Sequence, residues 1–247
     1  MAVAGTWFNK KGKNKNKMNI FFDFDGPIID VRDRYYRAYL ESLNNISIDK
    51  ERILSKEDFW SLKQNRVSDF EIGILSGLGI SESKDAADIR KDLSFKHDYL
   101  LLDKVFDDVF NTLKYLSSKK IDFFVVTLRR EKQIKDAIKQ LKLNTYLPLE
   151  KFFFVPDDRK IHNDIQEKFL LVVNAINRQR LDPKDVWIIG DADTDIHAGR
   201  LAKCGKIIAI PRGIRSRDQL AILKPDHIIE NLNEISSLIE AKAFTSA

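Results

Sequence analysis

Short apolar runs recur along this 247-residue chain, and each ends abruptly in polar residues, glycine or proline. They are shorter than a typical helix and apolar on both faces, which is typical of buried strands in a parallel sheet. Segments with a helical period separate most of them, so residues 106–240 predict a doubly wound (Rossmann-like) α/β sheet covered on both faces. The expected strands are Ile20–Phe22, Phe123–Val126, Phe152–Val155, Val186–Ile189 and Ile207–Ile210, and the clearest helical patterns are Val105–Leu116, Glu131–Leu141 and Asp164–Ile176.

Residues 32–101 break this alternation, because they show helical patterns and no convincing buried strand. Ser55 is a plausible N-cap for one of these helices, with Asp58 three residues later. The chain is therefore predicted to consist of a basic tail (1–17), an α/β core (18–31 and 102–247) and an inserted all-helical domain (32–101) that covers the end of the first strand. The helical patterns in the insert are Arg34–Leu43, Lys56–Leu62, Asp69–Leu75 and Lys84–Phe95.

The charge balance at first suggests a polyanionic partner, since 42 Lys and Arg against 37 Asp and Glu give a net charge of +5. Five lysines between residues 10 and 17 account for all of this excess, and they leave the remainder formally neutral. We therefore do not expect a nucleic-acid partner. The single cysteine, Cys204, excludes an internal disulfide, and no apolar run is long enough for a membrane span or signal peptide. We expect a cytoplasmic protein without membrane contact.

Acidic residues follow two of the expected strands. Asp23 and Asp25 stand two apart after the first strand, which places both carboxylates on one face. Two such acids repel unless a cation or a shared proton intervenes, and hard oxygen ligands suit Mg²⁺. A turn with two solvated aspartates is an equally weighted alternative on these residues alone.

A second acidic group, Gly190-Asp191-Ala192-Asp193-Thr194-Asp195, follows the strand that ends at Ile189. It lacks the glycine and distal glutamate of a calcium loop, so a magnesium site shared with Asp23 is favoured. Asp195 has an alternative role as the N-cap of a helix beginning near Ile196. Thr127 at its strand end and Lys168 in its helix are unremarkable by themselves.

Taken in order, these residues resemble the four motifs of the haloacid dehalogenase superfamily of phosphotransferases. The matching segments are Ile20–Gly26, Val125–Thr127, Lys168 and Ile189–Asp195, and the resemblance covers residues 18 to about 240. Further local matches favour the phosphoglycolate phosphatase and β-phosphoglucomutase branch. They are Asp25-Gly26-x-x-x-Asp30, Asp195-Ile196-x-Ala198-Gly199 and Pro225-Asp226-His227-Ile228-Ile229.

The resemblance implies a role for each motif residue. Asp23 would be the nucleophile that forms an aspartyl-phosphate, and Asp25 the general acid and base. Mg²⁺ would be held by Asp23, the backbone carbonyl of Asp25 and Asp191, with Asp195 acting through water or orienting the others. Thr127 and the amide that follows it, at Leu128, would bind the phosphoryl group, and Lys168 would neutralise charge.

The resemblance also implies a reaction class, because superfamily members with other chemistries are expected to lack an aspartate at the position of Asp25. The leading expectation is a Mg²⁺-dependent phosphatase that acts on a small phosphorylated metabolite. A phosphomutase is the near alternative, and a polynucleotide 3′-phosphatase or nucleic-acid binder using the basic arm is ranked low. The helical insert matches a C1 cap, which would exclude water and select the substrate. The sequence does not predict an oligomeric state.

Two departures from the family pattern bear on these expectations. Pro27 stands where Thr or Val is usual, which puts the motion of the cap in doubt. Thr127 is followed by Leu128-Arg129-Arg130, where most relatives have a small polar residue. Arg129 could either reach an anionic substrate or lie on a solvated helix start. In the insert, Lys63 and Arg66 are candidate substrate-binding cations, although ordinary surface charge is the more common role.

Overall fold

The computed structural model describes residues 18–44, 46 and 50–245. The predicted basic tail therefore lies outside the described residues. Six strands form one parallel sheet in the order β5-β4-β1-β6-β7-β8. The strands are β1 (Asn19–Phe22), β4 (Asp122–Arg130), β5 (Phe152–Val155), β6 (Val186–Gly190), β7 (Lys206–Ala209) and β8 (His227–Ile228).

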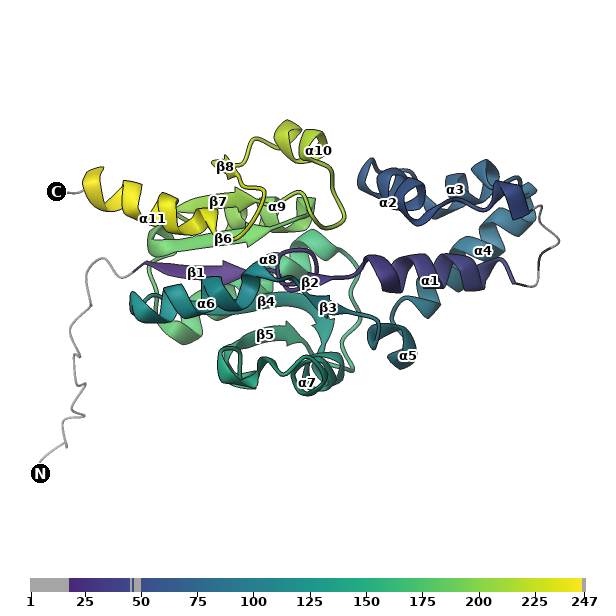
Figure 1. Cartoon of the computed structure of the whole chain (residues 1–247). Coiled ribbons are helices and arrows are strands. Elements are labelled where there is room, and N and C mark those ends of the chain that lie inside the picture. Colours follow the sequence, from purple (N-terminus) through teal and green to yellow (C-terminus); the bar gives the residue numbers. More distant parts are fainter. Residues whose placement is uncertain (1–17, 45, 47–49, 246–247) are drawn as a thin grey trace, which may run out of the picture.

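Helices cover both faces of this sheet (Figure 1). Because side chains alternate along a strand, Ile20 and Phe22 of β1 pack into one apolar cluster with α6 and α7, while Phe21 packs into the other with α8 and α9. The predicted doubly wound α/β core is confirmed. Its helices are α6 (Asp108–Ser118), α7 (Glu131–Gln140), α8 (Asp164–Gln179), α9 (Asp193–Leu201), α10 (Arg217–Ile222) and α11 (Glu234–Thr245), with short 3₁₀ turns at Leu143–Thr145, Leu149–Lys151 and Pro183–Asp185.

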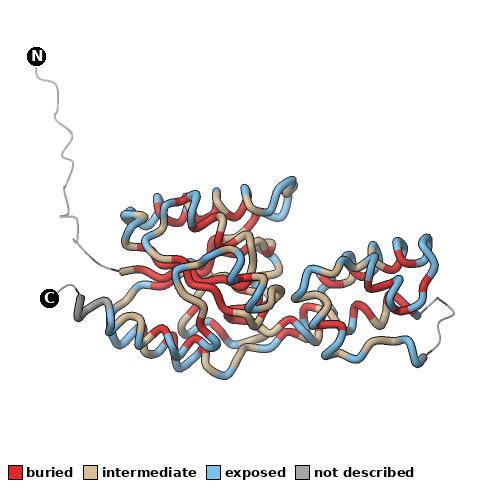
Figure 2. Tube along the Cα trace, turned by 90° about the horizontal axis from the view of Figure 1, so that it is seen from above, coloured by how far each residue is buried: buried red, intermediate tan, exposed pale blue. Residues whose placement is uncertain are grey.

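The helices α1 to α5, which we call the helical segment, lie beyond the carboxyl end of β1 (Figures 1 and 2). The segment has an apolar cluster of its own, built around Tyr39, Phe59 and Ile72. It buries this cluster away from the sheet and so has an independent source of hydrophobic stabilisation. Its helices are α1 (Arg32–Ser42), α2 (Lys56–Gln64), α3 (Asp69–Leu75), α4 (Ile80–Leu93) and α5 (His97–Leu100), with a 3₁₀ turn at Lys50–Arg52.

Two short strands join the helical segment to the sheet. Strand β2 (Ile29–Asp30) pairs antiparallel with β3 (Lys104–Val105), so the outgoing and returning chain lie side by side. No sequence pattern predicts this pair, because two residues are too few to show a period. The cap of α2 is as predicted, since the Ser55 side chain accepts a hydrogen bond from the amide of Asp58 at 3.1 Å.

The structure corrects two of the expected boundaries. Strand β4 does not end at Thr127 but continues to Arg130, with an irregular register between Val126 and Arg130. Helix α9 begins at Asp193 rather than near Ile196, so Asp195 is in its first turn and is not its N-cap. Over the part of the chain that the structure describes, no helix combines the length and apolar character that a bilayer crossing requires.

Candidate active site

The candidate site lies where β1, β4 and β6 end. These three strands are adjacent in the sheet, and parallel strands deliver their carboxyl ends to one edge. Asp23 follows β1, Asp191 follows β6, and Thr127 lies in β4. The amide of Asp23 donates to the carbonyl of Ile189 at 2.8 Å, which continues the β1–β6 pairing into the site.

Lys168 connects two carboxylates at the centre of the site. Its Nζ lies 2.6 Å from Asp23 Oδ1 and 2.8 Å from Asp195 Oδ1, and the lysine side chain is 2% exposed. Lys168 belongs to the sheet-facing stripe of α8, on which Leu171, Val172 and Ala175 follow at helical spacing. Burial alone lowers the pKa of a lysine, but Asp195 and Asp23 outweigh it and raise the pKa of Lys168.

Three carboxylates could hold a metal ion together. Oxygen atoms of Asp23, Asp191 and Asp195 all lie within 4.8 Å of one another. Lys168 is the cation paired with this cluster, so three ionised carboxylates would leave two negative charges locally. Hard oxygen ligands and a double negative charge match a divalent cation such as Mg²⁺. The residues present therefore fit the ion that the sequence predicts.

Asp191 is held in a close-fitting backbone cradle. A β-carbon on Gly26 would lie 2.3 Å from Asp191 Cγ, and one on Gly213 would lie 1.9 Å from Asp191 Oδ2, so side chains at either position would displace the carboxylate. Gly26 also has a φ of +94°, which other residues rarely adopt. The amide of Ile214 donates to Asp191 Oδ2 at 2.5 Å and fixes its orientation.

The pKa values in the cluster show an excess of negative charge. Burial, together with Asp195, raises the pKa of Asp23 to about 7, against the opposing effect of Lys168. Burial, together with Asp195 and Asp23, raises the pKa of Asp191 well above its usual range. A bound divalent cation would favour the ionised forms and reverse these shifts.

Thr127 is buried in β4, and its hydroxyl oxygen takes part in a hydrogen bond within that strand. Its side chain is 2% exposed, and its Oγ1 accepts a hydrogen bond from the amide of Arg129 at 3.1 Å. The hydroxyl proton is not used in that bond and is free to be donated. The adjoining Leu128 is half-buried and its side chain packs into the apolar cluster of α8 and α9, so only its backbone could contact a ligand.

Asp25 is paired with two buried arginines. Arg34 Nη2 lies 2.9 Å from Asp25 Oδ2, and Arg129 Nη2 lies 2.6 Å from Asp25 Oδ1. Burial raises the pKa of Asp25, but Arg129 and Arg34 outweigh it and lower that pKa to about 2. Arg129 is therefore neither on a solvated helix start nor free for a substrate, because β4 extends past Thr127 and turns its side chain inward.

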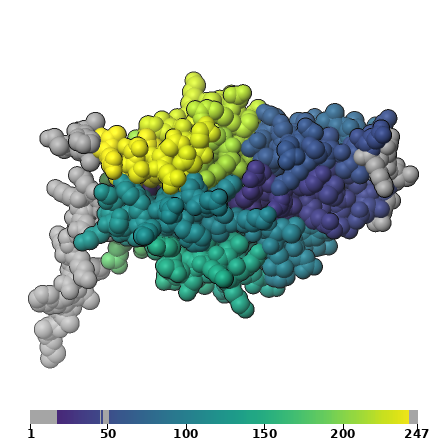
Figure 3. All heavy atoms as spheres, in the orientation of Figure 1, coloured from purple at the N-terminus to yellow at the C-terminus, as the bar shows by residue number. Residues whose placement is uncertain are grey.

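The candidate cations of the helical segment are both engaged in ion pairs. Lys63 Nζ lies 2.8 Å from Asp69 Oδ1 inside the segment. Arg66, which follows α2, reaches Asp193 Oδ1 at 2.7 Å and Gln219 Oε1 at 2.7 Å. Arg66 thus connects the helical segment to the core, at a contact where residues near 60 and near 215 touch in Figure 3.

Some polar residues around the site escaped the sequence analysis. Arg34 pairs with both Asp25 and Asp103, and Asp103 also pairs with Arg129. Arg212 donates to the backbone carbonyls of Gly26 and Pro27. Arg212 also pairs with Asp108 at 2.7 Å, which ties the segment around Pro27 to the start of α6. A weak sequence signal existed for Arg212 alone, which follows the β7 run and Pro211 at the same sheet edge.

Replacing Arg212 tests this anchor. In Arg212→Gln the Asp108 carboxylate, which is 11% exposed, keeps the hydrogen bond from the Leu232 amide but loses its cation, and we expect a loss of about 3 kcal/mol in the free energy of unfolding. Arg217→Gln is the matched control, because Arg217 pairs with Glu230 at the surface, where such pairs contribute about 0–1 kcal/mol. Urea unfolding of both variants measures the difference, and equal stabilities would contradict the assigned anchor.

Comparison with known proteins extends over nearly the whole chain. A family model described as haloacid dehalogenase-like hydrolase matches residues 20–209. Pyrophosphatase PpaX of Anoxybacillus flavithermus is 23% identical over 234 residues, which cover 91% of this chain and 97% of that protein. Among solved structures, a candidate phosphatase from Clostridium difficile aligns with a TM-score of 0.68 at 17% identity, covering 91% of this chain and 99% of the other.

A second solved structure, a candidate phosphoglycolate phosphatase from Lactobacillus delbrueckii, also aligns with a TM-score of 0.68, at 15% identity. It covers 91% of this chain and 98% of the other. At these identities the structural likeness concerns the fold. It confirms the α/β architecture expected from the sequence.

Proposed function

Because the chain belongs to the haloacid dehalogenase-like hydrolase family, we propose that it is a Mg²⁺-dependent phosphatase that hydrolyses a small phosphomonoester through an aspartyl-phosphate at Asp23. The observation that carries this proposal is the contact of Asp23 with Lys168, 2.6 Å apart, at the edge that also holds Asp191 and Asp195. A carboxylate beside one buried cation, within a cluster suited to a metal, can approach a phosphate dianion. An isolated carboxylate would repel it.

Two displacements complete the reaction. In the first, an Asp23 carboxylate oxygen attacks phosphorus and the bond to the leaving oxygen breaks, while protonated Asp25 gives that oxygen its proton, so that an aspartyl-phosphate and a neutral alcohol result. In the second, water attacks the phosphorus of this intermediate, Asp25 accepts the water proton, and the Asp23 carboxylate is released. Thr127 and the Leu128 amide hold phosphoryl oxygens, and Lys168 offsets the negative charge of Asp23 and the phosphate.

A magnesium ion would be held by Asp23, the Asp25 backbone carbonyl and Asp191, with Asp195 orienting the site. When bound it neutralises phosphate charge and lets an anionic nucleophile approach. The Asp191 carboxylate is already oriented before the ion binds, because Gly26 and Gly213 leave space for it and the Ile214 amide fixes one of its oxygens.

The state of Asp25 favours a second candidate substrate. The two arginines hold this carboxyl ionised, with its pKa lowered to about 2, so it is ready to act as a base but must gain a proton before it can protonate an alkoxide. A phosphoanhydride needs no such proton, because phosphate is a good leaving group. The relative from Anoxybacillus flavithermus is named a pyrophosphatase, so inorganic pyrophosphate belongs beside the phosphomonoesters as a candidate.

Phosphate release from a panel of compounds tests the proposal. The panel contains sugar phosphates, phosphoglycolate, nucleotides, a DNA 3′-phosphate and pyrophosphate, each with Mg²⁺ or with EDTA. We expect Mg²⁺-dependent release from at least one small compound. Isomerisation of a hexose phosphate without release would establish the mutase alternative, and no reaction with any compound would contradict a phosphatase.

We further propose that residues 32–101 form a cap over a core of residues 18–31 and 102–247, in a cytoplasmic enzyme. The helical segment lies over the carboxyl end of β1 and is joined by the paired strands β2 and β3, which is where a substrate-selecting cap would be hinged. Lys63 and Arg66 would reach a substrate only after leaving Asp69 and Asp193, so their role depends on motion of this segment.

Stabilisation by Mg²⁺ should depend on pH. Burial and the neighbouring carboxylates raise the pKa of Asp23 to about 7 and raise that of Asp191 well above its usual range, so at pH 6 the cluster holds protons that an incoming cation must displace. At pH 8 Asp23 is mostly ionised before the metal binds. We therefore expect the Mg²⁺-induced rise in Tm to be larger at pH 8 than at pH 6.

Thermal unfolding with and without Mg²⁺ at both pH values provides the measurement. Asp191→Asn should lose most of the rise at both pH values, whereas Asp182→Asn, which removes an exposed carboxylate that caps the 3₁₀ turn before β6, should keep it. A rise that is equal at pH 6 and pH 8 would show that the cluster is already ionised at the lower pH.

A further inference from the structure

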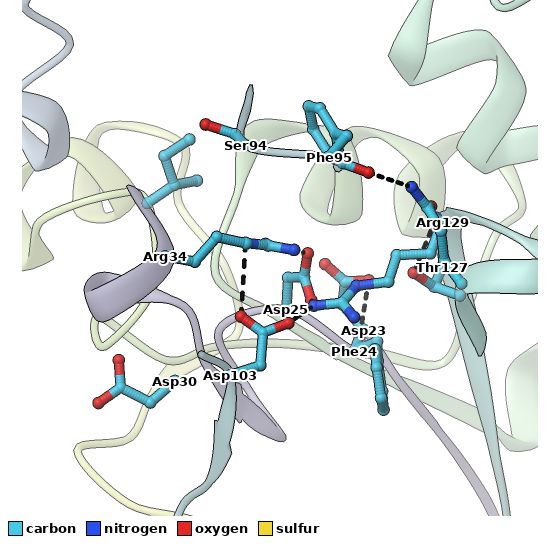
Figure 4. A network of polar contacts seen from close by, with 12 residues as sticks. Asp23, Phe24, Asp25, Asp30, Arg34, Ser94, Phe95, Asp103, Thr127 and Arg129 are labelled. Carbon is cyan, nitrogen blue, oxygen red and sulfur yellow. Dashed lines mark hydrogen bonds and ion pairs between the residues drawn. The ribbon is translucent and has the colours of Figure 1, made fainter. Parts of the chain in front are cut away.

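Two arginines and two aspartates form a closed buried network beside the candidate nucleophile (Figure 4). Arg34 and Arg129 each contact both Asp25 and Asp103. The Asp25 contacts measure 2.9 and 2.6 Å, and those with Asp103 measure 3.4 and 2.5 Å. Two positive and two negative charges cancel, so the group is neutral as a whole. It is therefore not built to attract a further anion.

The network holds Asp25 more rigidly than a single ion pair would. The side chains of Arg34 and Arg129 are 0% and 3% exposed, and both are packed against aromatic rings. The Arg129 guanidinium lies 4.9 Å from the ring centre of Phe24, and that of Arg34 lies 5.2 Å from the ring centre of Tyr35. Planar guanidinium groups fixed in this way offer donors in set directions, which restrict the carboxylate to one orientation.

The four residues come from four separate parts of the chain. Asp25 follows β1, Arg34 is in the first helix of the helical segment, Asp103 lies just before β3, and Arg129 is in β4. The chain that enters the helical segment therefore contributes Arg34 to the network, and the chain that returns from it contributes Asp103.

We propose that Arg129 and Arg34 are positioning residues for Asp25, with Asp103 as the shared counter-ion that keeps the two arginines in place. This inference rests on the proposed function, in which Asp25 transfers protons to and from the reacting oxygens. The arginines contact the Asp25 carboxylate and act through it. Loss of one arginine also eases protonation of Asp25, but it frees the carboxyl group to rotate away from the reacting oxygens, and we expect this loss of orientation to dominate. Proton transfer should therefore be impaired, while phosphate binding by Thr127 and Lys168 stays in place.

A leaving-group comparison separates this role from a structural one. An alkyl phosphate needs a proton on its leaving oxygen, whereas p-nitrophenyl phosphate leaves as a stable anion and needs little help. General acid–base catalysis contributes about 10²–10⁴-fold in rate. We expect Arg129→Gln to lower kcat for an alkyl phosphate by about 10²-fold or more and for p-nitrophenyl phosphate much less, with KM little changed in both cases.

Arg90→Gln is the matched control. Arg90 is also a buried arginine, ion-paired to an aspartate (Asp69) and packed against Tyr35, but it does not contact Asp25. The control should lower both rates equally if it lowers them at all. Equal losses for the two substrates in Arg129→Gln would overturn the proposal.

A double-mutant cycle tests the route through Asp25. In the Asp25→Asn background, Arg129→Gln should add almost no further loss, because its target is already gone. Additive losses would contradict a positioning role. If Arg129→Gln does not fold, the pair Arg129→Gln with Asp103→Asn keeps the network neutral and replaces it in both experiments, and Arg129→Lys should recover part of the alkyl phosphatase rate.

The outcome can be distinguished from failure of the proposed function. If wild-type protein releases no phosphate from these two substrates or from any compound of the panel, the phosphatase proposal fails. If wild-type is active, Asp23→Asn is inactive and Arg129→Gln shows no leaving-group dependence, only the inference about the arginines fails.

Discussion

Asp23→Asn should lower phosphatase activity by about 10⁴-fold or more, which is the size of effect expected when an enzyme loses its nucleophilic side chain. Asp23 is the carboxylate at the end of β1 that lies 2.6 Å from the Lys168 ammonium, and its amide is fixed to the Ile189 carbonyl. Asparagine keeps this shape and volume but cannot form the acyl-phosphate bond. The expected loss is therefore in kcat, with the protein still folded.

The measurement is phosphate release under saturating Mg²⁺, with circular dichroism and Tm as checks on folding. Asp182→Asn provides the control, since its carboxylate only caps a short 3₁₀ turn. Asp23→Asn should also be at least as stable as the wild type without metal, because it removes one of three mutually repelling buried carboxylates. Wild-type activity in Asp23→Asn would remove this residue from the reaction.

Lys168→Met should lower activity by about 10³-fold, in the range found when one group that stabilises transition-state charge is removed. It should also destabilise the protein. Asp23 and Asp195 would lose their only buried cation among the contacts described, and leaving a buried charge unpaired costs about 3–5 kcal/mol. Both effects have one cause, which is the ammonium group held at 2% exposure between two carboxylates.

The loss of stability in Lys168→Met should grow as the pH rises. Without the lysine, the already raised pKa of Asp23 rises further, and a carboxyl whose folded pKa lies above its unfolded value contributes stability that is lost as pH rises. The variant should therefore be most destabilised, relative to wild type, at pH 8, and less so at pH 6. Lys135→Met is the control, because Lys135 forms an exposed pair with Glu131. Matching urea midpoints for the two variants would contradict the role of Lys168.

The sequence predicted which strand ends would meet, because parallel strands bring their carboxyl ends to one edge. Asp23, Thr127 and Asp191 could be placed there from short apolar runs alone, and the structure brings them together with Lys168 and Asp195. The position of Lys168 is itself a signal of a buried partner, since it lies on the apolar stripe of α8, where an unpaired lysine would be costly.

The surroundings of Asp25 were beyond the reach of the sequence. Arg34 is one of three arginines in α1, and no local pattern tells which of them is buried. Its partner Asp103 is 69 residues away and is brought close only by the β2–β3 pair, which is too short to show a period. Arg129 was misplaced for a related reason, because the extension of β4 past Thr127 depends on pairing with β5 rather than on local propensity.

The central claim is that a phosphoryl group passes through the Asp23 carboxylate. Rapid acid quenching during turnover, followed by borohydride reduction and peptide mass analysis, tests it most directly, because reduction converts an aspartyl-phosphate to homoserine and leaves a free aspartate unchanged. The account predicts homoserine at residue 23 in wild-type protein with substrate and Mg²⁺, and none with EDTA. Steady turnover with residue 23 always recovered as aspartate, or homoserine at another position, would contradict it.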